Sequence, residues 1–132
     1  MLKKALCAAT VALVGAVASF TVASPASASD SYHSMNTLNG SGSMSFTEHG
    51  DRVWLFDGDP DGRSVWIDVF IGANDFVYGF AASGYGMENV RGASDGGPFN
   101  LPENTTICFE IFLTDNGVYW GSKNTACWYN DY

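Results

Sequence analysis

Residues 64–71 read Ser-Val-Trp-Ile-Asp-Val-Phe-Ile, and this stretch decides the fold class. Its aliphatic residues alternate with Trp66, Asp68 and Phe70. In an extended chain successive side chains point to opposite faces, so the aliphatic residues share one face and the other three share the opposite face. An alternation with a period of two predicts a β-strand that is buried on its aliphatic side.

The same alternation recurs on both sides of this stretch, and residues that favour turns separate the repeats. Phe76, Tyr78 and Phe80 are expected to share one face of their strand. Asn116-Gly117 is the strongest hairpin signal, because both residue types accept the positive φ angles of a tight turn. Further strands are predicted at residues 43–47, 52–56, 76–83, 99–101, 105–114, 118–120 and 126–129.

About seven or eight short strands, spaced by about ten residues, are typical of an all-β antiparallel sandwich of the Ig-like or jelly-roll-like kind. Residues 43–132 are expected to form this sandwich as a single domain. Of the three cysteines, Cys7 lies in the secretion signal described below, so Cys108 and Cys127 remain as an even pair in an exported chain, which predicts a disulfide. This disulfide would close a loop of about 20 residues, which contributes about 3 kcal/mol to the free energy of unfolding.

The beginning of the chain has the features of a secretion signal. Two lysines precede an uncharged run rich in alanine and valine, which is followed by the small-x-small site Ala26-Ser27-Ala28. These segments predict a signal peptide at residues 1–28, so we expect a secreted, extracellular protein with no membrane contact after cleavage. Residues 29–42 are rich in Gly, Ser and Asn and are expected to form a flexible N-terminal arm.

The charge of the predicted mature chain argues against some partners. Two of the six basic residues lie in the signal, so four basic residues remain against fourteen acidic ones, a net charge of −10. Nucleic-acid binding depends on basic side chains that neutralise phosphates, so we expect no nucleic-acid partner. Anionic membrane surfaces repel such a chain as well.

Five stretches of the chain carry a resemblance to a known group of proteins. They are the signal ending in Ala-Ser-Ala, the strand Gly42-x-Met44-x-Phe46, the hairpin Val53…Asp57…Asp61-Gly62-x-Ser64, the lead Leu101-Pro102-Glu103-Asn104 before Cys108, and the late Cys127. On these stretches the chain resembles the small secreted β-sandwich proteins of Streptomyces and related actinobacteria. The resemblance implies export and a β-sandwich fold, and it assigns no functional residue to this chain.

The sharpest local motif begins at Asp57. Acids at positions 1, 3, 5 and 12 of the motif, with Gly at position 6, match the spacing of a calcium-binding loop. The ligands would be the side chains of Asp57, Asp59, Asp61 and Asp68 and the backbone carbonyl of Arg63. Both flanks read as strands rather than the helices of an EF-hand, so a plain hairpin turn is the favoured interpretation. We therefore expect no cofactor, with calcium as the alternative.

A second candidate site is aromatic. Trp54, Phe56, Trp66 and Phe70 occupy the strand faces opposite the aliphatic stripe. If those faces were exposed, flat aromatic rings with acids beside them could bind sugar rings, whose CH faces stack while carboxylates take the hydroxyls. The alternative is that loops or the N-terminal arm cover these residues and make them part of the core.

Catalysis has little support in the sequence. Only His33 and His49 could act as bases near neutral pH, and neither lies in a nucleophile motif. We therefore expect a non-enzymatic extracellular binding or interaction module, calcium-modulated if the acidic loop binds metal, with a carbohydrate or another cell-envelope component as its ligand. The alternative is a secreted inhibitor or antagonist of an extracellular enzyme. It would act through the Gly-rich loop at 84–98, with Tyr85, Met87 and Arg91 as contacts.

Overall fold

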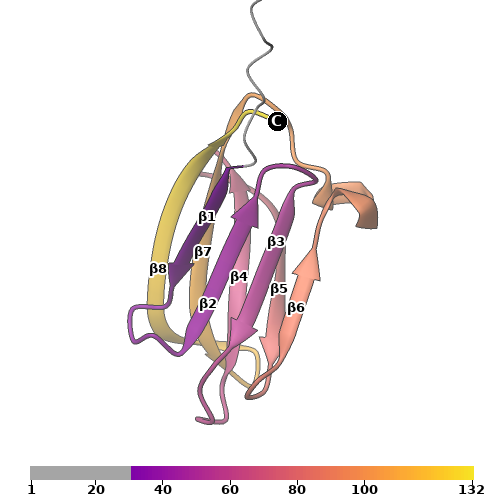
Figure 1. Ribbon diagram of the computed structural model, residues 1–132. Helices are drawn as coiled ribbons and strands as arrows, with labels where there is room; N and C mark the ends of the chain where they lie inside the picture. The colour runs from indigo at the N-terminus through magenta and orange to yellow at the C-terminus, as the bar shows by residue number, and fades with distance from the viewer. Residues whose placement is uncertain (1–30) are drawn as a thin grey trace, which may run out of the picture.

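The computed structural model describes residues 31–132 and shows two antiparallel β-sheets packed face to face (Figure 1). Each sheet has four strands. Sheet A has the order β1-β2-β3-β6, formed by Tyr32–Asn36, Gly42–Thr47, Arg52–Asp57 and Glu88–Arg91. Sheet B has the order β5-β4-β7-β8, formed by Asp75–Ser83, Ser64–Ile71, Thr105–Asp115 and Val118–Asn130. The prediction of an antiparallel β-sandwich is confirmed; the predicted signal peptide, residues 1–28, lies outside the described residues.

The aliphatic stripes face each other across the sandwich, as the alternation in the sequence requires. Val65, Ile67 and Val69 of β4 are fully buried, while Trp66, Asp68 and Phe70 lie on the outer face of sheet B. The other large side chains at the centre of the core are Met44, Phe46, Val53, Leu55, Leu101, Ile107, Phe109, Ile111 and Leu113. Burial of this apolar surface is the main source of stability in such a fold.

The predicted disulfide is present and lies outside this core. Cys108 of β7 and Cys127 of β8 stand directly opposite each other, with their Cα atoms 4.0 Å apart. Residues 116 and 117 form the predicted tight turn between these two strands, with φ of 47° at Asn116 and 80° at Gly117. The hairpin and its bridge therefore tie the last two strands of sheet B together.

The predicted N-terminal arm is wrong for residues 32–36, which form β1 and pair with β2. The inward residues of β1 are His33 and Met35, and His33 stacks on Trp128 with ring centroids 4.9 Å apart. Its outward residues are polar or carry a hydroxyl, since an edge strand needs only one apolar side. Two inward positions were too few to reveal the period in the sequence.

Two further strand predictions and one loop prediction differ from the structure. The two strands predicted at 118–120 and 126–129 belong to one continuous strand, β8. The residues between them stay in the strand, because its pairing with β7 is irregular around Leu113. The predicted strand at 99–101 is instead the end of a 3-10 turn, Gly97–Phe99, and its continuation. The loop expected at 84–98 contains β6 and a second 3-10 turn, Ala93–Asp95.

Phe76 does not share the buried face of Tyr78 and Phe80, contrary to the prediction from spacing. The pairing of β4 with β5 shifts between Val69 and Phe70, so one extra residue enters β5 at this point. A bulge of this kind reverses the side of the sheet on which the following residue lies. Phe76 is accordingly 61% exposed and packs edge-on against Phe70.

Among residues 31–132, no helix is long and apolar enough to cross a membrane.

Candidate functional site

The residues of the predicted calcium loop do not converge on one point. Asp57 is buried at the end of β3, where its carboxylate accepts hydrogen bonds from the backbone N–H groups of Asp59 and Gly84 at 3.3 and 3.2 Å. The side chain of Asp61 accepts from the N–H of Arg63 at 2.8 Å and forms an ion pair with its guanidinium at 3.0 Å. These are the contacts of a hydrogen-bonded turn.

Asp68 lies apart from that turn, because β4 begins at Ser64 and carries Asp68 to the middle of sheet B. In the part of the chain that the structure describes, no group of three or more His, Cys, Asp or Glu side chains could hold a metal ion. The side chain of Asp59 also has a protein partner, since it accepts a hydrogen bond from the Ser41 hydroxyl at 3.0 Å. The geometry is that of the hairpin turn rather than of an ion-binding loop.

The four predicted aromatic residues fall on two different surfaces. Trp54 and Phe56 lie on the outer face of sheet A, and Trp66 and Phe70 lie on the outer face of sheet B. The rings of Trp54 and Phe56 are parallel within 8° with centroids 5.7 Å apart, so each covers part of the other. All four are half-buried and none belongs to the core. The sequence predicts correctly that these side chains point away from the aliphatic stripe, but it does not show that they lie on two different sheets.

The outer face of sheet B carries three parallel rows of side chains across its strands. In the middle row, Asp68 of β4 stands opposite Glu110 of β7. On one side of that row, Trp66 pairs with Phe112, and on the other side Phe70 pairs with Cys108 of the disulfide. A pair of carboxylates is therefore flanked by aromatic rings on one side and by Phe70 and the disulfide on the other.

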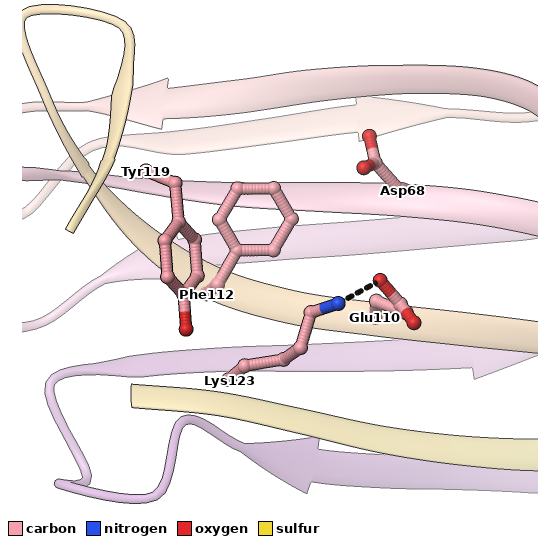
Figure 2. Close-up of a pocket in the computed structure, with 5 residues that line it drawn as sticks. All are labelled: Asp68, Glu110, Phe112, Tyr119 and Lys123. Carbon is pink, nitrogen blue, oxygen red and sulfur yellow. Dashed lines mark ion pairs between the residues drawn. The ribbon is translucent and has the colours of Figure 1, made fainter. Parts of the chain in front are cut away.

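A shallow hollow of about 340 Å³ opens over the middle of this face (Figure 2). Asp68, Glu110 and Lys123 contribute its charged groups, and Phe112 and Tyr119 contribute its aromatic surface. The ammonium of Lys123 lies 2.6 Å from Oε2 of Glu110, and the hydrogen bond that it donates to this carboxylate raises the pKa of Lys123. The rings of Phe112 and Tyr119 have centroids 5.5 Å apart and meet at 59°.

Asp68 is held in place by Trp66. The indole Nε1–H donates a hydrogen bond of 2.7 Å to Oδ1 of Asp68. Both groups lie over Gly79 of β5, where a Cβ atom would collide with Asp68 Oδ1 and approach Trp66 Nε1 to 3.0 Å. Burial raises the pKa of Asp68, the indole hydrogen bond opposes this, and the neighbouring charge of Glu110 raises it further. Gly79 thus leaves the space in which the tryptophan and the carboxylate meet.

Glu110, Phe112, Tyr119 and Lys123 were missed in the sequence. The alternation at 105–114 does place Glu110 and Phe112 opposite the buried stripe, which is the available signal. Their meeting with Asp68 depends on the register of β4 against β7, which the pattern of a single strand does not specify.

A second exposed surface lies at the turn between β5 and β6. Tyr85 is 67% and Met87 is 53% exposed. The turn is tied to the end of β3, because Asp57 donates its N–H to Met87 O at 3.0 Å and accepts from Gly86 N–H at 2.8 Å. Arg91 does not join them. It lies in β6 beside the rings of Phe80 and Phe99, with its guanidinium carbon 5.8 and 5.7 Å from their centroids.

Burial raises the pKa of Asp51 and Asp57 as well as that of Asp68. A carboxyl with a higher pKa in the folded chain binds protons more readily when folded, so its contribution to stability is lost as pH rises through the folded pKa. That contribution is fully present below the ordinary Asp pKa of 3.8.

We therefore expect the urea midpoint of unfolding to rise as the pH is lowered from 7 to 4.5. The rise should be smaller in Asp68→Asn, which lacks one of these carboxyls. A midpoint that falls as the pH is lowered would contradict the raised pKa values of the three carboxyls.

Comparisons with protein family models, with curated protein sequences and with solved structures found no match.

Proposed function

We propose that this chain is a secreted, non-enzymatic binding protein and that the hollow on the outer face of sheet B binds a carbohydrate. The observation that carries the proposal is the pair of carboxylates, Asp68 and Glu110, which lies beside the aromatic rings of Phe112 and Tyr119 in one open hollow. Sugars present hydroxyls around their edge and CH groups on their faces, so they need polar acceptors and apolar surfaces in the same place. Lys123 adds a donor to these two acceptors.

The opposite face of the sandwich is less suited to this role. Trp54 and Phe56 stack on each other, which uses one side of each ring. The sugar site expected on all four aromatic residues is therefore proposed on the Trp66 side alone.

The proposal is tested by truncating an exposed wall of the hollow. Tyr119 is 57% exposed, so Tyr119→Ala should fold normally. We expect it to weaken binding about fivefold, because an aromatic contact is worth about 1 kcal/mol. The assay is calorimetric titration with soluble oligosaccharides of β-1,4-linked glucose, N-acetylglucosamine and glucosamine. Tyr85→Ala, which removes an exposed ring at the turn between β5 and β6 that does not line the hollow, is the matched control and should leave the affinity unchanged.

The alternative, a secreted inhibitor of an extracellular enzyme, is favoured by one observation. The turn that presents Tyr85 and Met87 is fixed to β3 by backbone hydrogen bonds and by the buried carboxylate of Asp57. Such fixing lowers the entropy lost when a loop docks. This function predicts stoichiometric inhibition of at least one of subtilisin, trypsin and lysozyme, and loss of that inhibition in Met87→Ala. Unchanged inhibition in the variant would exclude the turn as the contact.

A further inference from the structure

The charges of the hollow do not cancel. Asp68 and Glu110 are acids and Lys123 is the one base among the five side chains that line it. One negative charge therefore remains when all three groups are ionised. The surrounding molecule strengthens this sign, since the whole chain carries fourteen acidic residues against six basic ones. A hollow of this charge attracts cations and repels anions.

The contacts show which carboxylate is available. Glu110 already holds the ammonium of Lys123 through Oε2. Asp68 is bound through Oδ1 by the neutral indole N–H of Trp66, which supplies a hydrogen bond and no charge. Asp68 is thus the acid without a cationic partner of its own, and a ligand can approach it from the open side of the hollow.

Lys123 also shows that the hollow accommodates an ammonium group. Figure 2 shows its Nζ directed at Glu110, in a hollow that Phe112 and Tyr119 also line. Aromatic rings attract ammonium groups through their negative faces, so Phe112 and Tyr119 suit a cation as well as the CH face of a sugar. A second ammonium, from a ligand, would find a carboxylate acceptor of the same kind in Asp68.

We infer that the sugar bound in this hollow carries a free, protonated amine, which pairs with the carboxylate of Asp68. The inference rests on the proposed function and narrows it to amino sugars. The CH faces of the sugar rings would lie against Phe112 and Tyr119. Neutral sugars would bind only through the aromatic contacts, and acidic sugars would be repelled.

The test compares hexamers of β-1,4-linked glucosamine, N-acetylglucosamine and glucose by calorimetric titration at pH 6, where the glucosamine amines are largely charged. These three probes differ only in the group at the second carbon: an ammonium, an acetamide or a hydroxyl. We expect the glucosamine hexamer to bind at least tenfold more tightly than the other two. Its affinity should fall as salt is added, because salt screens the ion pair.

Two substitutions give opposite signs. Asp68→Asn should weaken binding of the glucosamine hexamer at least tenfold, because it removes the ionic acceptor and retains the shape. Lys123→Met should strengthen the same binding about threefold, because it removes a like charge from the hollow. A neutral or acidic sugar that uses Lys123 as a donor would instead lose affinity in this variant. Glu88→Gln, the same loss of charge on sheet A, is the matched control and should change little.

The outcomes separate this inference from the proposed function. Equal binding of the glucose and glucosamine hexamers, or weaker binding in Lys123→Met, overturns the amine inference and leaves the carbohydrate proposal standing. Binding of none of the three hexamers overturns the proposed function itself. Equally tight binding of spermidine supports recognition of the amine and contradicts recognition of the sugar.

Discussion

Replacing Gly79 with alanine is expected to reduce ligand affinity at least thirtyfold while the protein remains folded. The new methyl group would collide with Oδ1 of Asp68 and lie 3.0 Å from both Trp66 Nε1 and the backbone oxygen of Ile67. Gly79 has no positive φ, so alanine fits its backbone conformation and the effect is purely one of contact. The indole and the carboxylate must move apart, which removes two contacts worth about 2 kcal/mol together.

The fold should tolerate this change, because the crowding arises on the outer face rather than in the core. Overpacking of this kind costs about 1–3 kcal/mol of stability, which urea unfolding measures separately from binding. Ser83→Ala, a small change at the exposed end of the same strand, is the control and should affect neither property. Unchanged affinity in Gly79→Ala would mean that Trp66 and Asp68 do not shape the ligand site.

The largest loss of stability is expected for Asp51→Ala. Asp51 is 2% exposed, and its carboxylate accepts from Leu101 N–H at 2.9 Å and from Asn130 Nδ2 at 3.1 Å. Asn130 in turn donates to the carbonyl of Pro102 at 3.1 Å. One side chain therefore joins the turn after β2, the lead into β7 and the end of β8.

We expect Asp51→Ala to lower the free energy of unfolding by about 2–4 kcal/mol. Two buried donors lose their acceptor, which costs about 1–3 kcal/mol. Asp51 also has a φ of 52°, where alanine is about 1 kcal/mol less favourable than a residue that tolerates the left-handed region. Urea unfolding measures the loss. Asp51→Asn keeps one acceptor oxygen and tolerates this φ, so it should lose about half as much; a loss below 1 kcal/mol in Asp51→Ala would contradict the role of the network.

Most of the strands and their buried faces could be predicted, because the longer strands carry their own alternating signal. The alternation at 64–71 and 105–114 identified the core side of β4 and β7 correctly. The disulfide followed from the pairing of two cysteines. The alternation is a property of a short stretch of chain, so it indicates the buried face of a strand without knowledge of the strands that pair with it.

The candidate site could not be predicted, because it depends on pairings between distant strands. The spacing of Asp68 from Asp57 in sequence suggests a calcium loop as the alternative to a hairpin turn, whereas the register of β4 against β7 places Asp68 opposite Glu110. The bulge that turns Phe76 outward likewise has no signature in the order of residues. The prediction of a flexible arm at β1 is wrong, because this short edge strand has only two inward side chains and so gives too few alternations to indicate a strand.

Binding in the hollow is tested most directly by titrating the isotope-labelled protein with glucosamine hexamer and recording the shifts of its backbone amide signals. Binding in the hollow predicts that the largest shifts occur at residues 66–68, 110–112 and 119–123, in strands β4, β7 and β8. The signals of β3 and of the turn at 84–87 should stay in place. Shifts confined to that turn or to the Trp54 and Phe56 face, or no shifts at all, would contradict the assignment of the site to sheet B.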